Sequence, residues 1–126
     1  MVKPIVQQVS KVRMEEINYS KYLPLSEATF YVLLVLTEPL HGYAIMQKVE
    51  DISEGNVVIG PGTLYGAFAT LEKQGLISKV REEERRKYYQ LSDKGRLVLA
   101  EHIRRLEIMF HNARLALPKL KTGGAK

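Results

Sequence analysis

The residues with the clearest chemical potential lie between positions 60 and 87. Cationic side chains gather around a charged turn in this stretch: Lys79, Arg81, Arg85, Arg86 and Lys87. Five cations against three glutamates leave a net charge of +2 between positions 79 and 87. Guanidinium and ammonium groups at this density are typical of surfaces that bind nucleic-acid phosphates. A solvated turn without a ligand is the alternative, and the preceding helix favours the first interpretation.

A short helix with a small outer face is predicted just before these cations. Pro61 suits the first helical turn, and Gly75 suits the left-handed residue after the last turn. One face is apolar, through Leu64, Phe68 and Leu71 with Ala67 beside them. The opposite face carries small and polar residues, namely Gly62, Gly66, Ala69 and Lys73, flanked by Tyr65 and Thr70. Such a face fits the major groove of DNA, although an ordinary amphipathic helix could also carry it.

The amides at the start of this helix are a further candidate site. The first N–H groups of a helix have no hydrogen-bond partner within the helix, and they lie at the positive end of the helix dipole. Gly62 and Thr63 supply two of these amides. We therefore predict that they contact a phosphate.

The elements predicted around this helix match the arrangement of a winged helix-turn-helix domain. Ser26 is a predicted N-cap for a helix that ends near Leu36, and a second helix begins near His41. Tyr43 is expected to be a packed aromatic residue with a tethered hydroxyl. Strands are predicted at 76–81 and 87–91, and the glycine-free turn between them at 82–86 predicts a longer loop. The fold class is mainly α with a small β-hairpin: a winged helix-turn-helix domain at 25–91, plus a long C-terminal dimerisation helix.

That C-terminal helix is predicted at residues 92–117, with Ser92 as its N-cap. Its apolar positions are spaced by 4, 3, 4, 3 and 4 residues, namely Leu99, Ile103, Leu106, Phe110, Ala113 and Leu117. This 3.5-residue repeat is typical of a seam between helices, so we predict a homodimer whose seam residues become buried only in the dimer. A helix folded back on its own core is the alternative. Pro118 is expected to stop the helix, leaving residues 118–126 as a basic disordered tail, and residues 1–24 are expected to form an arm or loose helix.

Composition narrows the class of protein. The 126 residues include no cysteine and carry a net charge of +5 at a pI near 9.5, a balance that favours an anionic partner. The longest apolar run, residues 30–36, is too short to span a membrane, and a cytoplasmic location is expected. His41, His102 and His111 are not spaced as metal ligands, and the last two are expected at the surface. No catalytic set stands out, so neither an enzyme nor a cofactor is expected.

Several motifs together resemble the PadR family of transcriptional regulators, over about residues 25–92. They are Leu40-His41-Gly42-Tyr43, Gly62-Thr63-Leu64-Tyr65, Leu71-Glu72-Lys73-Gln74-Gly75-Leu76-Ile77, Arg85-Arg86-Lys87-Tyr88-Tyr89-Gln90-Leu91-Ser92, and Gly95. The resemblance implies a winged-helix DNA-binding domain, a homodimer formed through the C-terminal helix, and usually repression. It also implies an effector that is planar and apolar or phenolic, bound at the dimer centre in some members. Gly66 and Ala69 depart from the family pattern, and the absence of tryptophan excludes an effector pocket built on tryptophan stacking.

The function expected from the sequence is therefore a homodimeric, sequence-specific transcriptional regulator. Its partner is double-stranded DNA at a two-fold symmetric operator. Repression relieved by a small effector is the expected mode. Two alternatives stay open: a winged helix used as a protein-interaction module, and an architectural DNA binder that tolerates many sequences.

Overall fold

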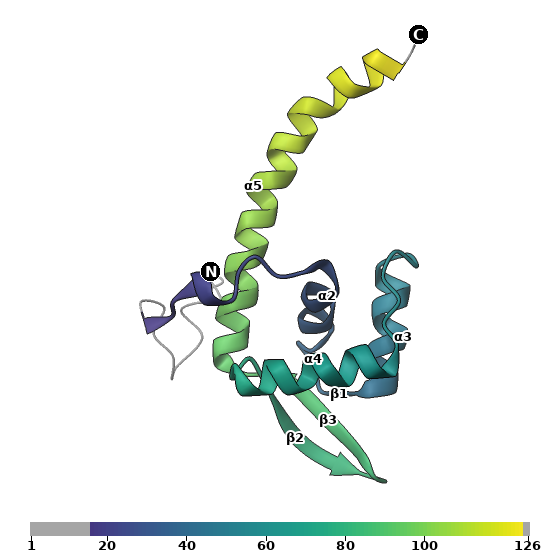
Figure 1. The fold of residues 1–126 in the computed structure, drawn as a ribbon, viewed down its shortest axis with the longest axis vertical. Coiled ribbons are helices and arrows are strands. Elements are labelled where there is room, and N and C mark those ends of the chain that lie inside the picture. Colours follow the sequence, from purple (N-terminus) through teal and green to yellow (C-terminus); the bar gives the residue numbers. More distant parts are fainter. Residues whose placement is uncertain (1–15, 125–126) are drawn as a thin grey trace, which may run out of the picture.

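The computed structural model describes residues 16–124, and Figure 1 shows their arrangement. In chain order the elements are the 3-10 helix η2 (Tyr19–Lys21), α2 (Glu27–Val35), β1 (Leu40–His41), α3 (Gly42–Ile52), α4 (Pro61–Lys73), β2 (Ile77–Glu83), β3 (Arg86–Leu91) and α5 (Asp93–Gly124). Three short helices, a small sheet and one long helix confirm the predicted fold class. Of the predicted N-terminal arm, residues 1–15 lie outside the described part of the chain.

Side chains cap the helices near the predicted positions. The backbone N–H of Thr29 donates to Ser26 Oγ at 3.1 Å, which caps α2. The N–H of Ala44 donates to His41 Nδ1 at 3.5 Å, so an imidazole caps α3. Pro61 is in the first turn of α4 as predicted, where its missing N–H costs no helical bond. These local signals explain why the helix starts were predictable.

The sheet has one strand more than the predicted hairpin. Its order is β1-β3-β2, and all pairs are antiparallel. Leu40 pairs with Tyr89 and His41 with Tyr88, which joins the start of α3 to the hairpin. A strand of two residues is too short to show the alternation by which a strand is detected.

The prediction of a longer loop at 82–86 is wrong. Glu83 pairs with Arg86, so only Glu84 and Arg85 form the turn. Both have positive φ, 50° and 67°, which is the conformation that a two-residue hairpin turn requires. Asn and Gly usually fill these positions, but the pairing of the flanking strands holds a glutamate and an arginine in the left-handed region here.

The core lies where α2, α3, α4 and the start of α5 meet the sheet. Its largest fully buried side chains are Leu33, Leu36, Ile45, Leu64, Leu76, Leu97, Val32, Val49 and Val98. Leu64, Phe68 and Leu71 of α4 are buried as predicted. Because its inner face is fixed in this core, α4 presents the opposite face outward.

Helix α5 differs from the prediction at its C-terminal end. It passes through Pro118 and continues to Gly124, so residues 118–124 do not form the predicted disordered tail. Proline removes one backbone hydrogen bond and commonly bends a helix. Around Pro118 the helix is exposed. In Figure 1, α5 extends away from the rest of the molecule and bends near this end.

The first half of α5 belongs to the core of its own chain. Leu99 is only 4% exposed and Ile103 packs on the core, so the prediction that every seam residue needs a second copy for burial is wrong for Leu99. His102 was expected at the surface but is 5% exposed, with its ring 5.2 Å from that of Phe30. Leu99 and His102 are buried because α5 packs against the rest of the domain, and the spacing of apolar residues along the helix does not reveal this packing. His111 is exposed as predicted.

Candidate nucleic-acid interface

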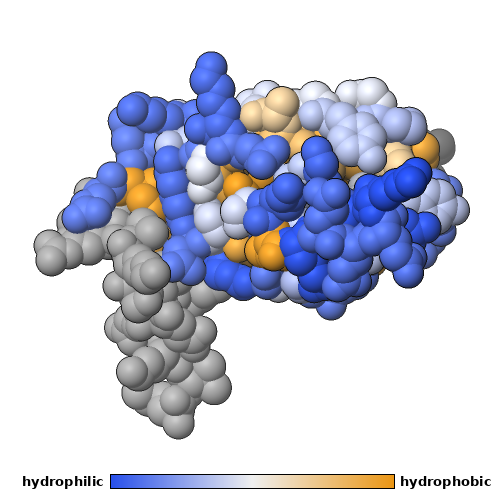
Figure 2. Space-filling model, turned by 90° about the horizontal axis from the view of Figure 1, so that it is seen from below, coloured by the Kyte–Doolittle hydropathy of each residue, from blue (hydrophilic) through white to orange (hydrophobic). Residues whose placement is uncertain are grey.

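The outer face of α4 and the β2–β3 hairpin form a continuous exposed surface, which we call the reading face. Its members are the residues predicted to bind DNA, all of them exposed: Gly62, Thr63, Tyr65, Gly66, Ala69, Thr70, Lys73, Lys79, Arg81, Arg85, Arg86 and Lys87. Figure 2 views the molecule from the side toward which the hairpin projects, and hydrophilic side chains dominate there. The structure therefore brings together residues up to 25 positions apart in sequence, from Gly62 to Lys87.

The N-terminus of α4 is open. Gly60 is its N-cap and offers no capping side chain, and the first helical bond runs from the N–H of Leu64 to the carbonyl of Gly60 at 3.0 Å. The amides of Gly62 and Thr63 precede that bond, and both residues are exposed. This leaves two N–H groups at the positive end of the helix dipole on the reading face.

The structure divides the five hairpin cations into two groups. Lys79 lies 3.5 Å from a carboxylate oxygen of Glu82. Arg81 Nε lies 2.9 Å from a carboxylate oxygen of Glu83, and the guanidinium carbon of Arg81 lies 4.2 Å from the centre of the Tyr88 ring. Within residues 16–124, by contrast, Arg85, Arg86 and Lys87 form no ion pair, and they lie at or beside the turn. These three side chains can therefore bind a phosphate without first breaking an ion pair.

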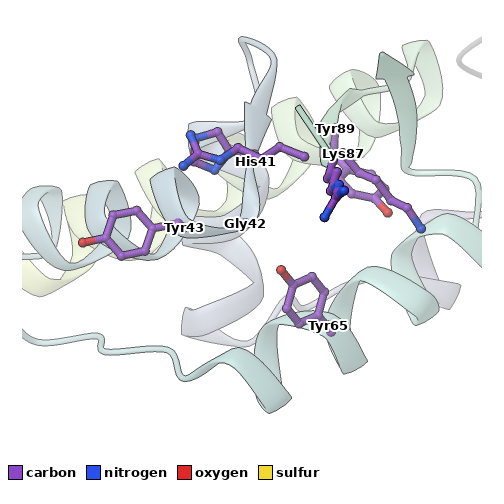
Figure 3. A pocket seen from close by; sticks show the side chains of 8 residues that line it. His41, Gly42, Tyr43, Tyr65, Lys87 and Tyr89 are labelled. Carbon is purple, nitrogen blue, oxygen red and sulfur yellow. The ribbon is translucent and has the colours of Figure 1, made fainter. Parts of the chain in front are cut away.

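A groove of about 410 Å³ separates the turn from the start of α3. Its walls come from β1, α3, α4 and β3 with the preceding turn, and its lining consists of His41, Gly42, Tyr43, Tyr65, Arg85, Arg86, Lys87 and Tyr89. Figure 3 shows Tyr65 rising from α4 between the α3 terminus and the hairpin side chains. The groove thus combines phenol hydroxyls with cations on the reading face.

Tyr43 was not predicted to belong to this surface. The expectation that it is packed is wrong, because 64% of its surface is exposed. Its hydroxyl is tethered, accepting a hydrogen bond from Gln47 Nε2 at 3.0 Å. The buried side of α3 runs through Gly42, Ile45 and Val49, and helical geometry places Tyr43 about 100° away from Gly42.

Aromatic contacts fix Tyr65 to the core. Its ring meets Phe68 edge-on at 5.8 Å and 80°, and Phe68 lies 4.5 Å from Tyr89 of β3. Burial raises the pKa of Tyr89, and the charge of Glu72 and the nearby Tyr65 add to the effect. The three rings therefore join α4 to the hairpin and hold both parts of the reading face in one arrangement.

Within residues 16–124, no group of three or more His, Cys, Asp or Glu side chains is placed to hold a metal ion. Over the same residues, no helix has both the length and the apolar character that a bilayer crossing requires.

Comparison with known proteins places this geometry in context. The chain is 40% identical over 75 residues to a 37.1 kDa protein of transposon TN4556 from Streptomyces fradiae, covering 59% of this chain and 21% of that protein. It is 30% identical over 69 residues to the transcriptional regulator YqjI of Escherichia coli (strain K12), covering 55% of this chain and 33% of the relative. The chain thus spans a third or less of the length of these two relatives.

A solved transcriptional regulator from Clostridium thermocellum has a similar fold, with a TM-score of 0.58 at 26% identity over 72% of this chain and 96% of that one. Residues 32–101 match the family described as "Transcriptional regulator PadR-like family", and this match spans more than half of the chain. It includes the core of the domain, α4 and the whole hairpin. A winged helix with this reading face, matched over that range, belongs to the PadR-like family of transcriptional regulators.

Proposed function

We propose that this protein binds duplex DNA as a homodimer at a two-fold symmetric operator. The observation that carries the proposal is the position of the small outer face of α4 beside three hairpin cations that form no ion pair within residues 16–124. The major groove admits one α-helix, and the hairpin then lies close to the flanking phosphates. We assign base contacts to the outer face of α4 and backbone contacts to the hairpin and to the amides of Gly62 and Thr63.

Dimerisation is proposed through the part of α5 that extends beyond the core. Phe110 and Leu117 are 61% and 46% exposed, and Ala113 is exposed beside them. These positions continue the 3.5-residue repeat, and large apolar side chains in a row are costly to leave in water. Leu106 is half-buried and lies between the core and this exposed stretch. In this proposal residues 25–91 are the DNA-binding head and the distal part of α5 joins two heads.

We further propose that the dimer acts in the cytoplasm as a repressor that an apolar or phenolic effector releases. Support comes from family membership and from an apolar recess of about 320 Å³ between α2 and α5. Phe30, Leu106 and Met109 are among its lining residues. A planar molecule bound beside α5 would change how the two heads are spaced and so weaken operator binding.

The decisive experiment is selection of bound fragments from a random duplex pool, followed by anisotropy titration of the enriched site. We expect one enriched two-fold sequence and an affinity that falls about 10³-fold or more between 50 and 200 mM salt if six phosphates are contacted. Salt-sensitive binding without an enriched sequence would favour the architectural alternative. No binding at low salt would favour a protein-interaction module.

Two variants separate the assigned roles. Tyr65→Ala should weaken binding and reduce discrimination between the selected site and a site with one base pair changed. Arg85→Ala combined with Arg86→Ala should weaken all sequences alike and reduce the salt slope, because phosphate contacts carry no sequence information. Lys119→Ala, near the far end of α5, is the matched control for loss of charge and should change neither quantity.

A further inference from the structure

Gly42 lies so close to Tyr65 that a side chain at position 42 would displace the Tyr65 hydroxyl. A Cβ at Gly42 would lie 2.9 Å from the Tyr65 hydroxyl oxygen and 3.4 Å from Cζ of the same ring. Non-bonded contacts of a Cβ under 3.0 Å are essentially never observed. Gly42 is the first residue of α3 and is buried. The α3 terminus and the phenol of α4 therefore touch only because position 42 carries a hydrogen in place of a methyl group.

The other side of the Tyr65 ring is fixed as well. Phe68 lies edge-on to it at 5.8 Å, one turn further along α4. Yet 57% of Tyr65 remains exposed, and the residue lines the groove that faces the hairpin cations. In Figure 3 the hydroxyl points from α4 toward the α3 terminus, at the mouth of this groove. The ring thus lies between the α3 backbone and an aromatic edge, and its hydroxyl lies in the groove beside the α3 terminus.

We propose that Gly42 is a positioning residue for DNA recognition, which acts by fixing the hydroxyl of Tyr65. Gly42 itself is buried and would contact no base. A methyl group at position 42 would push the phenol out of its place and move the hydroxyl away from its partner on the DNA. The inference rests on the proposed function, since it assumes that α4 reads DNA.

Helix propensity alone predicts the opposite effect of this substitution. Alanine is a better helix former than glycine, so Gly42→Ala without a clash would not destabilise α3. A loss of DNA binding on Gly42→Ala would therefore come from the contact with Tyr65. Removing the hydroxyl should relieve the closest contact and leave the 3.4 Å contact to Cζ, which a small ring shift accommodates.

The test is a double-mutant cycle on the DNA site selected with the unmodified protein. We expect Gly42→Ala to weaken binding fivefold or more and to reduce discrimination against a site with one base pair changed. Tyr65→Phe should lose part of the same affinity. In the Tyr65→Phe background, Gly42→Ala should change affinity less than twofold. Tyr43→Phe is the matched control, because it removes a hydroxyl from the same groove and should leave the full effect of Gly42→Ala.

Several outcomes would overturn the inference while the proposed function stands. One is DNA binding by Gly42→Ala within twofold of the unmodified protein. Another is an equal loss of DNA affinity on Gly42→Ala whether position 65 is Tyr or Phe, which would mean that Gly42 acts through α3 alone. Thermal melts check folding: if Gly42→Ala unfolds and Tyr65→Phe does not restore it, the hydroxyl contact is not the cause. Absence of DNA binding by the unmodified protein would refute the proposed function, and this inference would fall with it.

Discussion

A Cβ at Gly95 would lie 2.0 Å from the carbonyl oxygen of Leu76. The same carbonyl accepts the N–H of Ser92 at 3.0 Å, and Ser92 Oγ in turn accepts the N–H of Gly95 at 2.9 Å. The first turn of α5 therefore packs directly on the backbone that leads into β2. This junction fixes the direction in which α5 leaves the head.

We expect Gly95→Ala to lower the free energy of unfolding by about 1–3 kcal/mol or more, because backbone must move to admit the methyl group. Chemical denaturation would measure the loss. Gly66→Ala is the matched control: a Cβ there has no atom within 4 Å, so helix propensity should make the change neutral or stabilising. Equal stability of the two variants would contradict the close contact at Gly95.

The hairpin turn offers a stabilising substitution. Glu84 has a φ of 50°, a region that asparagine tolerates better than glutamate. Glu84→Asn should therefore raise the free energy of unfolding by roughly 0.5–1 kcal/mol. The same change within β2, Glu82→Asn, should not stabilise, because asparagine is disfavoured in strands. Denaturation midpoints of the two variants test the two-residue turn, and a destabilised Glu84→Asn would contradict it.

Two positions of the apolar repeat in α5 should respond differently to substitution. Phe110 is exposed, so Phe110→Lys should leave the head folded while preventing the proposed dimer, since it places a charge in the seam. Sedimentation at micromolar concentration should then give the 14.4 kDa monomer, and operator binding should be lost. A dimer that survives this substitution would place the seam elsewhere.

Leu99→Ala is the counterpart of that variant. Leu99 is buried in the core of its own chain, so its truncation should cost about 2–5 kcal/mol of folding stability. The loss should be the same at low and high protein concentration, because no second copy is needed to bury this residue. A loss of stability that depends on concentration would contradict the assignment of Leu99 to the core.

Acid titration should reveal the ion pairs of Glu101. Hydrogen bonds from Arg104 at 2.8 Å, followed by one from Arg105 at 3.2 Å, hold the pKa of this carboxyl at about 2, below its ordinary 4.5. A lowered folded-state pKa contributes stability above pH 4.5, and that stability is lost as the pH falls from 4.5 toward 2. Glu101→Gln should therefore flatten the pH dependence of the unfolding free energy over this range.

Structural features that depend on neighbouring residues in the sequence, such as helix ends, could be predicted. Features that depend on tertiary contacts could not. Pro61 and Gly75 mark the ends of α4 because each suits one conformation, and its buried face follows from spacing. The 3.5-residue repeat of α5 is equally compatible with a core and with a seam, so it could not show that Leu99 is internal. His102 was misplaced for the same reason. Positive φ at Glu84 arises from strand pairing, which the residue type does not reveal.

For the reading face, the sequence predicted which residues would be exposed together. It did not predict which of the hairpin cations would form ion pairs. The pairing of Lys79 and Arg81 with glutamates depends on strand register. Tyr43 was missed because it was expected to be packed, whereas the buried side of α3 runs through Gly42, Ile45 and Val49. Gly42 matched a family motif, but its close contact with Tyr65 comes from the crossing of two helices, which no local pattern encodes.

The continuity of α5 has a mechanical consequence. The helix is anchored in the head through Leu97 and Val98, and it has no glycine between positions 96 and 122 that could serve as a joint. Beyond Ile103, which packs on the core, α5 continues for 21 residues, from Arg104 to Gly124, or about 32 Å at 1.5 Å per residue, with the bend near Pro118 toward its far end. A tilt of a few degrees at its far end therefore swings the attached head through several ångströms at the other. Stiffness in this rod, rather than any contact with a base, would set the distance between paired heads.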